Sequence, residues 1–116
     1  MREIKFRAFS KNTGMWSWEE IINSPENDLK KLFVSPDWEA VMQFTGLKDK
    51  NGVEIYEGDI LRGDWSIADD ITVGAVEYYG GAFRFKPSGL PLEFGYYRKE
   101  CEAIGNIYQN PDLLTK

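Results

Sequence analysis

The sequence of 116 residues contains no histidine and a single cysteine, Cys101. Without histidine the chain cannot form a Ser-His-Asp or Cys-His nucleophile system, an HExxH zinc site or an imidazole proton shuttle. One thiol cannot form an intramolecular disulfide, and zinc sites made of Cys and His side chains need several ligands. We therefore expect no catalytic residue, no metal site and no cofactor, and we interpret Cys101 as a buried, unreactive side chain.

Basic residues are also scarce. The chain has 14 Lys and Arg against 19 Asp and Glu, which gives a net charge of −5. This balance does not favour a general nucleic-acid or membrane binder. The first residues alternate charged and apolar side chains and lack the apolar core of a signal peptide, and no run approaches the roughly 20 apolar residues of a membrane-spanning helix. We expect a cytoplasmic protein with no membrane partner, for which nucleic acid is not the favoured partner.

Aromatic residues, in contrast, are abundant, because four Trp, six Tyr and seven Phe make up 15% of the chain. A chain of this length fits one domain and buries about two-thirds of its unfolded surface. Eleven glycines separate short β-branched or aromatic runs, a pattern typical of small barrels rather than of helical bundles. We predict a mainly β, single-domain fold, an SH3-like or related small β-barrel with one short helix; an α+β fold is the alternative.

Residues 1–18 predict an N-terminal β-hairpin. Apolar and charged side chains alternate over residues 2–9, and Asn12-Thr13-Gly14 has the composition of a turn. An aromatic strand that includes Trp16 and Trp18 follows the turn. The two segments are therefore expected to pair.

Lys5 and Arg7 fall on one face of the first predicted strand and, with Trp16, form a candidate basic and aromatic patch. Barrels that bind single-stranded nucleic acid combine aromatic rings with a basic groove in this way. The simpler interpretation is a solvated strand face, since antiparallel sheets commonly expose one polar face. We favour the solvated face.

A variable stretch over residues 19–38 holds the one predicted helix. A Ser-Pro pair at 24–25 suits an N-cap and a first helical residue, and the apolar spacing after it predicts a helix over 25–33. Residues 39–45 fit a strand or a helix, because so few residues do not separate the two periods. We interpret them as a strand, the first of a β-rich core over 39–116.

The β-rich core contains further strand and turn signals. Gly80-Gly81 is a tight connection between two strands, and the leucines of the last helical turn are expected to plug the core. The predicted elements are short apolar segments at 55–56 and 60–61, strands at 71–79, 82–85, 92–97 and 101–108, a loop over 87–91 and a helical turn over 110–114.

Residues 49–59 are dense in turn residues. Asp49, Gly52, Gly58 and Asp59 are predicted to turn the chain, because glycine tolerates positive φ and an aspartate can accept hydrogen bonds from nearby N–H groups. Aligned on Gly52, the segment lacks the acidic ligands that begin and end an EF-hand loop, so we do not expect calcium binding. The exposed tip of this turn is a candidate partner contact, made of Lys48, Lys50 and Asn51.

Glu57 and Asp59 offer a second functional interpretation. Two carboxylates on one strand face could serve a hydrolase or hold Mg²⁺. They share a face only if the backbone stays extended, and Gly58 between them favours a bulge or turn. We favour the structural role.

Four segments are distinctive and occur in this order: MREIKFRAF at 1–9, MQFTGLKDKNGVEIYEGDIL at 42–61, GAVEYYGGAF at 74–83 and IGNIYQNPDLL at 104–114. Together they resemble the YopX family, small proteins encoded by phages and prophages of bacteria. Phe9 stands where the family pattern usually has Trp, and Phe44 where Tyr is common. The resemblance implies a β-rich fold and self-association into a larger assembly, and it implies no known activity and no catalytic residues.

These observations give three functional hypotheses. The first is a non-enzymatic phage or prophage accessory protein in the bacterial host cytoplasm, acting as a homo-oligomer or by binding a host or phage protein. The second is a barrel that binds single-stranded nucleic acid, and the third is a carboxylate-based hydrolase. An exposed apolar patch, a basic groove with exposed rings, or carboxylates converging in a pocket would distinguish them.

Overall fold

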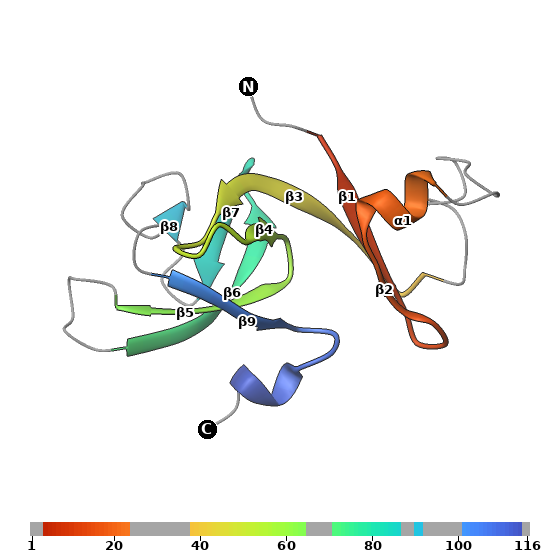
Figure 1. Cartoon of the computed structure of the whole chain (residues 1–116). Helices are drawn as coiled ribbons and strands as arrows, with labels where there is room; N and C mark the ends of the chain where they lie inside the picture. The colour runs from red at the N-terminus through yellow and green to blue at the C-terminus, as the bar shows by residue number, and fades with distance from the viewer. Residues whose placement is uncertain (1–3, 24–37, 65–70, 87–89, 92–100, 115–116) are drawn as a thin grey trace.

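The computed structural model describes residues 4–23, 38–64, 71–86, 90–91 and 101–114. The described part is mainly β, as predicted, and contains one short α-helix (Figure 1). In chain order the elements are β1 (Phe6–Ser10), β2 (Gly14–Trp16), α1 (Trp18–Ile22), β3 (Ala40–Lys48), β4 (Glu54–Tyr56), β5 (Asp59–Asp64), β6 (Ile71–Tyr79), β7 (Ala82–Lys86), β8 (Leu90–Pro91), β9 (Cys101–Asn106) and the 3₁₀ helix η1 (Pro111–Leu114).

The strands form two antiparallel sheets. A four-stranded sheet has the order β2-β1-β3-β4, and a five-stranded sheet has the order β8-β7-β6-β5-β9. The five-stranded sheet curls into a half-barrel, which agrees with the predicted small barrel. Figure 1 shows β1, β2 and α1 on one side of the molecule and β5–β9 on the other, with β3 running between them. We call β4–β9 the barrel, and residues 4–23 and 38–44 the N-terminal unit.

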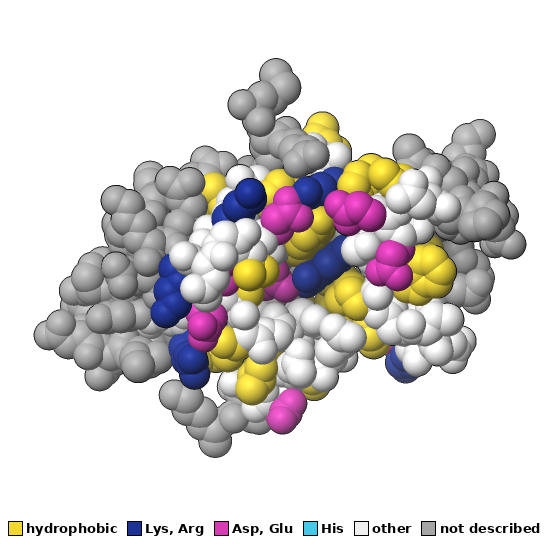
Figure 2. All heavy atoms as spheres, viewed as in Figure 1, with side chains coloured by type: hydrophobic (Ala, Val, Ile, Leu, Met, Phe, Trp, Pro, Cys, Tyr) yellow, Lys and Arg dark blue, Asp and Glu magenta, His cyan; other side chains and the backbone are white. Residues whose placement is uncertain are grey.

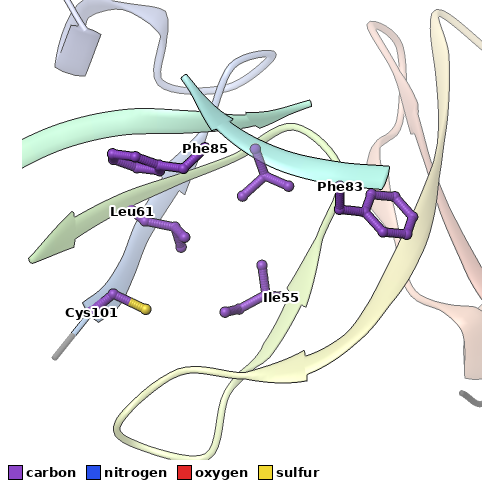
Figure 3. Close-up of a cluster of buried hydrophobic side chains, with 6 residues drawn as sticks. Ile55, Leu61, Phe83, Phe85 and Cys101 are labelled. Carbon is purple, nitrogen blue, oxygen red and sulfur yellow. The ribbon is translucent and has the colours of Figure 1, made fainter. Parts of the chain in front are cut away.

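The barrel core is lined by side chains from β4, β5, β6, β7 and β9 (Figure 3). Gly74 in β6 makes room for this packing, because a Cβ there would lie 2.0 Å from the Lys86 carbonyl oxygen and 2.6 Å from the Phe85 ring. Phe85 therefore fills the space that a side chain at Gly74 would need. The buried residues are Ile55, Leu61, Val76, Phe83, Phe85 and Cys101, with Leu47 and Ala103 packed against them.

A second hydrophobic cluster lies in the N-terminal unit. Its aromatic rings meet edge to face, with centroids 5.8 Å apart for Trp16 and Trp38 and 6.2 Å apart for Phe6 and Trp18. Such arrangements add to the stabilisation that comes from burial. The cluster consists of Ala8 and Ile21, which are buried, and of Phe6, Trp16, Trp18, Trp38 and Val41 around them.

Helix α1 corrects the prediction of an aromatic strand through Trp18. Ser17 is the N-cap: its side chain accepts a hydrogen bond from the Glu20 N–H, and the Glu20 carboxylate accepts one from the Ser17 N–H. This reciprocal capping box starts a helix at Trp18. The predicted helix over 25–33 lies outside the described residues.

Most of the predicted strands are confirmed. Ala8 pairs with Trp16 in the N-terminal hairpin, and the ambiguous stretch after residue 38 is the strand β3. Tyr79 pairs with Ala82 across the two-residue turn at Gly80-Gly81. Each of these segments has its turn signal close by in the sequence, which is why local reasoning found them.

The C-terminal third differs in detail from the expectation. The predicted loop over 87–91 ends in the short strand β8, and β9 stops at Asn106, two residues before the predicted end. The leucines of η1 do not plug the core, because Leu113 and Leu114 are 36% and 42% exposed. The polar Asn106–Asn110 turn precedes η1, and the barrel core is already filled by strand side chains. The predicted strand at 92–97 lies outside the described residues.

Candidate functional site

Lys5, directly before β1, and Arg7, within β1, have largely buried side chains, so the expectation of a solvated face is wrong. Lys5 is only 7% exposed, and its ammonium group forms an ion pair with Glu54 of β4. The Lys5 Nζ also lies 4.8 Å from the centre of the Phe44 ring. A buried ammonium group is tolerated when a carboxylate and a ring face compensate for its lost hydration.

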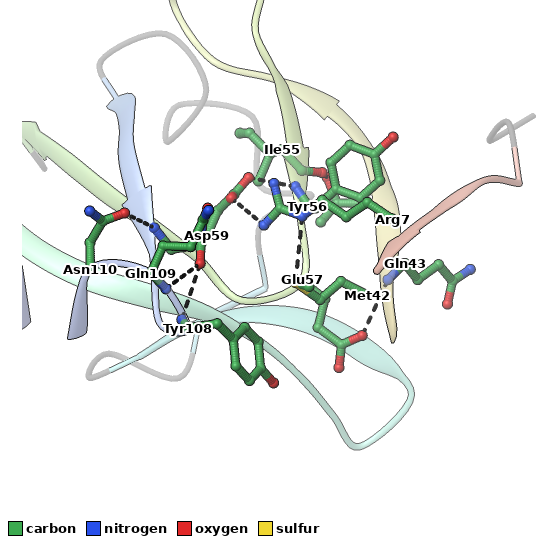
Figure 4. A network of polar contacts seen from close by, with 12 residues as sticks. Arg7, Met42, Gln43, Ile55, Tyr56, Glu57, Asp59, Tyr108, Gln109 and Asn110 are labelled. Atoms are coloured by element: carbon green, nitrogen blue, oxygen red, sulfur yellow. Dashed lines mark hydrogen bonds and ion pairs between the residues drawn. The ribbon is translucent and has the colours of Figure 1, made fainter. Parts of the chain in front are cut away.

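Arg7, two residues after Lys5, also contacts one carboxylate and one aromatic ring (Figure 4). Its Nη2 lies 2.6 Å from Asp59 Oδ1, and its Cζ lies 4.8 Å from the centre of the Tyr56 ring. The Arg7 Nε also lies 3.5 Å from the Met42 sulfur. Lys5 and Arg7 thus form a two-step ladder in which each cation contacts one carboxylate and one aromatic ring.

Burial is the largest influence on the pKa values of Asp59 and Tyr56, the two side chains beside Arg7. It raises the pKa of the Asp59 carboxyl, and this effect outweighs the opposing Arg7 charge and the hydrogen bond from the Tyr56 N–H. Burial also raises the pKa of the Tyr56 hydroxyl, with the Glu54 charge acting in the same direction. Burial thus favours the protonated forms of Tyr56 and Asp59, whereas the nearby cations lower both pKa values.

Trp16 does not join this charged face. It pairs with Ala8 across the hairpin, so it lies on the face opposite Arg7. Its ring packs in the N-terminal cluster, and its indole N–H donates to the Thr13 hydroxyl at 2.8 Å. The candidate patch of Lys5, Arg7 and Trp16 is therefore split between two sides of one sheet.

Asp49 holds the turn between β3 and β4, as the sequence predicted, and also attaches it to β9. Its Oδ1 accepts hydrogen bonds from the Asn51 and Val53 N–H groups at 2.8 and 2.9 Å. Its Oδ2 accepts from the Ala103 N–H at 2.9 Å. Asp49 is only 6% exposed, and both of its carboxylate oxygens accept hydrogen bonds from backbone N–H groups.

Gly58 and Asp59 form a second turn, between β4 and β5. Gly58 has a φ of +87°, and a Cβ there would lie 3.3 Å from the Met42 sulfur and 3.4 Å from the Tyr108 ring. Asp59 Oδ2 accepts a hydrogen bond from the Tyr56 N–H at 2.7 Å, which closes the turn. The predicted turn role of both residues is confirmed, and the bond between Asp59 and Arg7 is an addition to it.

The carboxylates of Glu57 and Asp59 face different partners. Glu57 Oε1 lies 3.4 Å from the Gln43 N–H of β3, whereas Asp59 points at Arg7 (Figure 4). Within the described ranges, no group of three or more His, Cys, Asp and Glu side chains could hold a metal ion. The arrangement therefore serves to join strands.

The candidate contact residues Lys48, Lys50 and Asn51 are exposed at the tip of the β3–β4 turn, as expected. A hydrogen bond attaches the backbone of this tip to β9, because the Lys50 N–H donates to the Cys101 carbonyl at 3.0 Å. Cys101 itself is buried, and burial together with the Asp49 charge raises the pKa of its thiol to about 11. The exposed lysine tip is thus joined by a backbone hydrogen bond to the residue that carries the protonated thiol.

Sequence reasoning missed the two acidic partners of Lys5 and Arg7. Glu54 and Asp59 lie 49 and 52 residues away from Lys5 and Arg7 in the chain. The signal that was available is a pair of cations two positions apart in the first predicted strand, together with acidic residues within the turn-rich segment 49–59. That signal gives no register, so it could not pair them.

Comparison with known proteins gives one matching family model and a similar crystal structure. The family model described as "YopX protein" matches residues 5–115. The chain belongs to the YopX family. Its structure is similar to the crystal structure of protein EF1440 from Enterococcus faecalis, with a TM-score of 0.70 and 31% sequence identity over 98% of this chain and 99% of that chain. The comparison with curated proteins found no match to this YopX-family chain.

Among the residues that the structure describes, no helix is long and apolar enough to cross a membrane. The single described α-helix, α1, has five residues.

Proposed function

We propose that this YopX-family chain is a non-enzymatic phage or prophage accessory protein that acts through protein contacts, chiefly with copies of itself, in the host cytoplasm. The observation that carries the proposal is a pair of exposed tyrosines at the β6–β7 hairpin. Tyr78 is 52% exposed and Tyr79 is 69% exposed. Tyrosine is enriched at protein interfaces, where it buries a large ring and keeps a polar group.

The residues that suggested nucleic-acid binding or hydrolysis make contacts within the fold. Nucleic-acid binding was based on Lys5 and Arg7, and both are occupied by internal ion pairs. Hydrolysis was based on Glu57 and Asp59, which face different partners. This leaves surface contact as the function that the described side chains support best.

Light scattering coupled to size-exclusion chromatography tests the role of the more exposed tyrosine. We expect Tyr79→Ser to have a lower mass than the wild type at the same concentration, because it removes the more exposed ring and leaves the Tyr78 ring on the buried Phe83. The matched control is Lys86→Ala, which changes an exposed residue at the end of the same hairpin. Equal masses for the wild type and the tyrosine variant would contradict the assignment of this surface.

A further inference from the structure

Asn51-Gly52 is the one Asn-Gly pair in the sequence, and it lies at the exposed tip of the β3–β4 turn. Such a pair is chemically labile, because glycine has no side chain to keep its backbone nitrogen away from the preceding asparagine side chain. A Cβ added at Gly52 would have no neighbour within 4 Å, so the surroundings leave space around the pair. Sequence and exposure together mark Asn51 as a site of spontaneous chemical modification.

The reaction of this pair is deamidation, in which water is the only other reactant. The Gly52 backbone nitrogen bonds to the side-chain amide carbon of Asn51, the bond from that carbon to the amide nitrogen breaks, and ammonia leaves with the Gly52 amide proton. Water then opens the resulting ring at either of its carbonyl carbons. The product at position 51 is aspartate or isoaspartate, and both carry a negative charge that asparagine lacks.

The folded turn opposes this reaction. The Gly52 N–H donates to the Asp49 carbonyl oxygen at 3.0 Å, so the proton that must leave is already bound. The neighbouring backbone is held as well, because every N–H from Asp49 to Val53 donates a hydrogen bond. The acceptors are the Val53 carbonyl for Asp49, the Cys101 carbonyl for Lys50, the Asp49 carbonyl for Gly52, and Asp49 Oδ1 for Asn51 and Val53. The Gly52 nitrogen therefore reaches the Asn51 side chain only when the turn opens.

Asp49 is the residue on which the closed turn depends most. It is only 6% exposed, and its carboxylate accepts hydrogen bonds from the N–H groups of Asn51, Val53 and Ala103. Opening the turn separates this carboxylate from its donors, and a buried polar group that loses its hydrogen bonds is strongly unfavourable. Local opening that breaks such contacts is rare in the folded state. Asp49 therefore limits how often Gly52 is free to react.

We propose that Asn51 is a deamidation site whose reaction is slowed by the folded β3–β4 turn, with Asp49 as the residue that keeps the turn closed. The product lies beside Lys50 in the candidate contact tip, where its carboxylate opposes the lysine charges. Figure 2 shows Lys and Arg side chains interspersed with Asp and Glu side chains on the visible face. On a surface of mixed sign the charge of a small contact depends on few side chains, so one added carboxylate changes it substantially. The proposal does not depend on self-association.

Peptide mapping by mass spectrometry during incubation at mildly alkaline pH measures the deamidation of Asn51. Each protein is incubated folded and, as its own reference, unfolded in denaturant. In the wild type we expect the folded chain to react at least about tenfold more slowly than the unfolded chain, because the reaction needs local opening. In Asp49→Ala the folded and unfolded rates should agree within about threefold. The matched control Glu77→Ala removes an exposed carboxylate from β6 and should keep the wild-type ratio.

Two further measurements keep the test decisive if Asp49→Ala does not fold. Asp49→Asn keeps one acceptor oxygen and should lower the ratio of unfolded to folded rates by at least about threefold relative to the wild type. Hydrogen exchange of the wild-type Gly52 amide also requires release from the Asp49 carbonyl. This exchange should be at least about tenfold slower than in the unfolded chain.

Several results would overturn the proposal. Equal deamidation rates for the folded and unfolded wild type would mean that the turn does not protect Asn51. A wild-type ratio in folded Asp49→Ala or Asp49→Asn would mean that other contacts keep the turn closed. A Gly52 amide that exchanges at the unfolded rate would mean that its hydrogen bond does not restrain the nitrogen, and an unfolded chain without deamidation would show that Asn51 is not labile.

Discussion

At the residue scale, the most recognisable block of the chain, residues 42–61, consists of parts that shape the backbone. Asp49 and Asp59 each accept hydrogen bonds from main-chain N–H groups within their own turns. Gly52 and Gly58 both have positive φ, at +81° and +87°. The block is therefore distinctive because two turns depend on particular residue types, which is a structural reason for its appearance.

Gly52→Val tests this interpretation of the first turn. A β-branched residue at positive φ is strained even though a Cβ added at Gly52 would have no neighbour within 4 Å. We expect a loss of roughly 1–3 kcal/mol in the free energy of unfolding, or about 4–15 °C in melting temperature. Asp59→Asn should cost at least as much, because the amide keeps an acceptor oxygen for the Tyr56 N–H but leaves the charge of the largely buried Arg7 without its carboxylate. Thermal melting of both variants checks the order, and a wild-type melting temperature for Gly52→Val would refute it.

Arg7→Met should make stability depend on pH through Asp59. Burial already raises the pKa of the Asp59 carboxyl, and Arg7 is the largest influence that lowers it. Removing Arg7 therefore raises this pKa further. A folded-state pKa above the unfolded value adds stability that is complete below the unfolded pKa and is lost as pH rises through the folded pKa.

The stability gap between the wild type and Arg7→Met should accordingly shrink as pH falls from 7 toward 4. Each tenfold gain in the proton affinity of Asp59 corresponds to about 1.4 kcal/mol. Denaturant unfolding at several pH values measures the gap. In an Asp59→Asn background the narrowing should vanish, and a gap that widens on acidification would show that Asp59 is not the titrating group.

At the element scale, strands were predictable where their partners are close in the sequence. The β1–β2 and β6–β7 hairpins carry their own turns, and their pairing follows from alternation. Helix α1 was missed although Ser17 and Glu20 give a capping-box signal, because the aromatic run around them also fits a strand. The burial of Lys5 and Arg7 was not predictable. Their acidic partners lie about 50 positions away in the chain, and the pairing depends on the sheet order.

Gly74→Ala tests how closely β6 and β7 pack. The added methyl group would meet the Lys86 carbonyl oxygen, a main-chain atom that can move only if the strand pairing moves with it. We expect a loss of at least about 1–3 kcal/mol in the free energy of unfolding, the scale of an overpacked core. Glu77→Ala, an exposed position on the same strand, is the matched control and should change stability by less than about 0.5 kcal/mol. Equal unfolding free energies for the two variants would contradict the close approach.

At the scale of the whole molecule, the surface offers two separate candidate contacts, the tyrosines of the β6–β7 hairpin and the lysines at the tip of the β3–β4 turn. Lys48→Ala/Lys50→Ala should leave the melting temperature nearly unchanged, because both side chains are exposed. If the tip binds a partner protein, the same variant recovers less of that partner in a pull-down than the wild type does. A large drop in melting temperature would instead place these lysines in the fold.

Self-association is the central claim, and sedimentation equilibrium of the wild-type chain from low to high micromolar concentration tests it most directly. The account predicts a mass that is a multiple of 13.4 kDa, approached as the concentration rises. A mass that stays at 13.4 kDa across the whole range would contradict it.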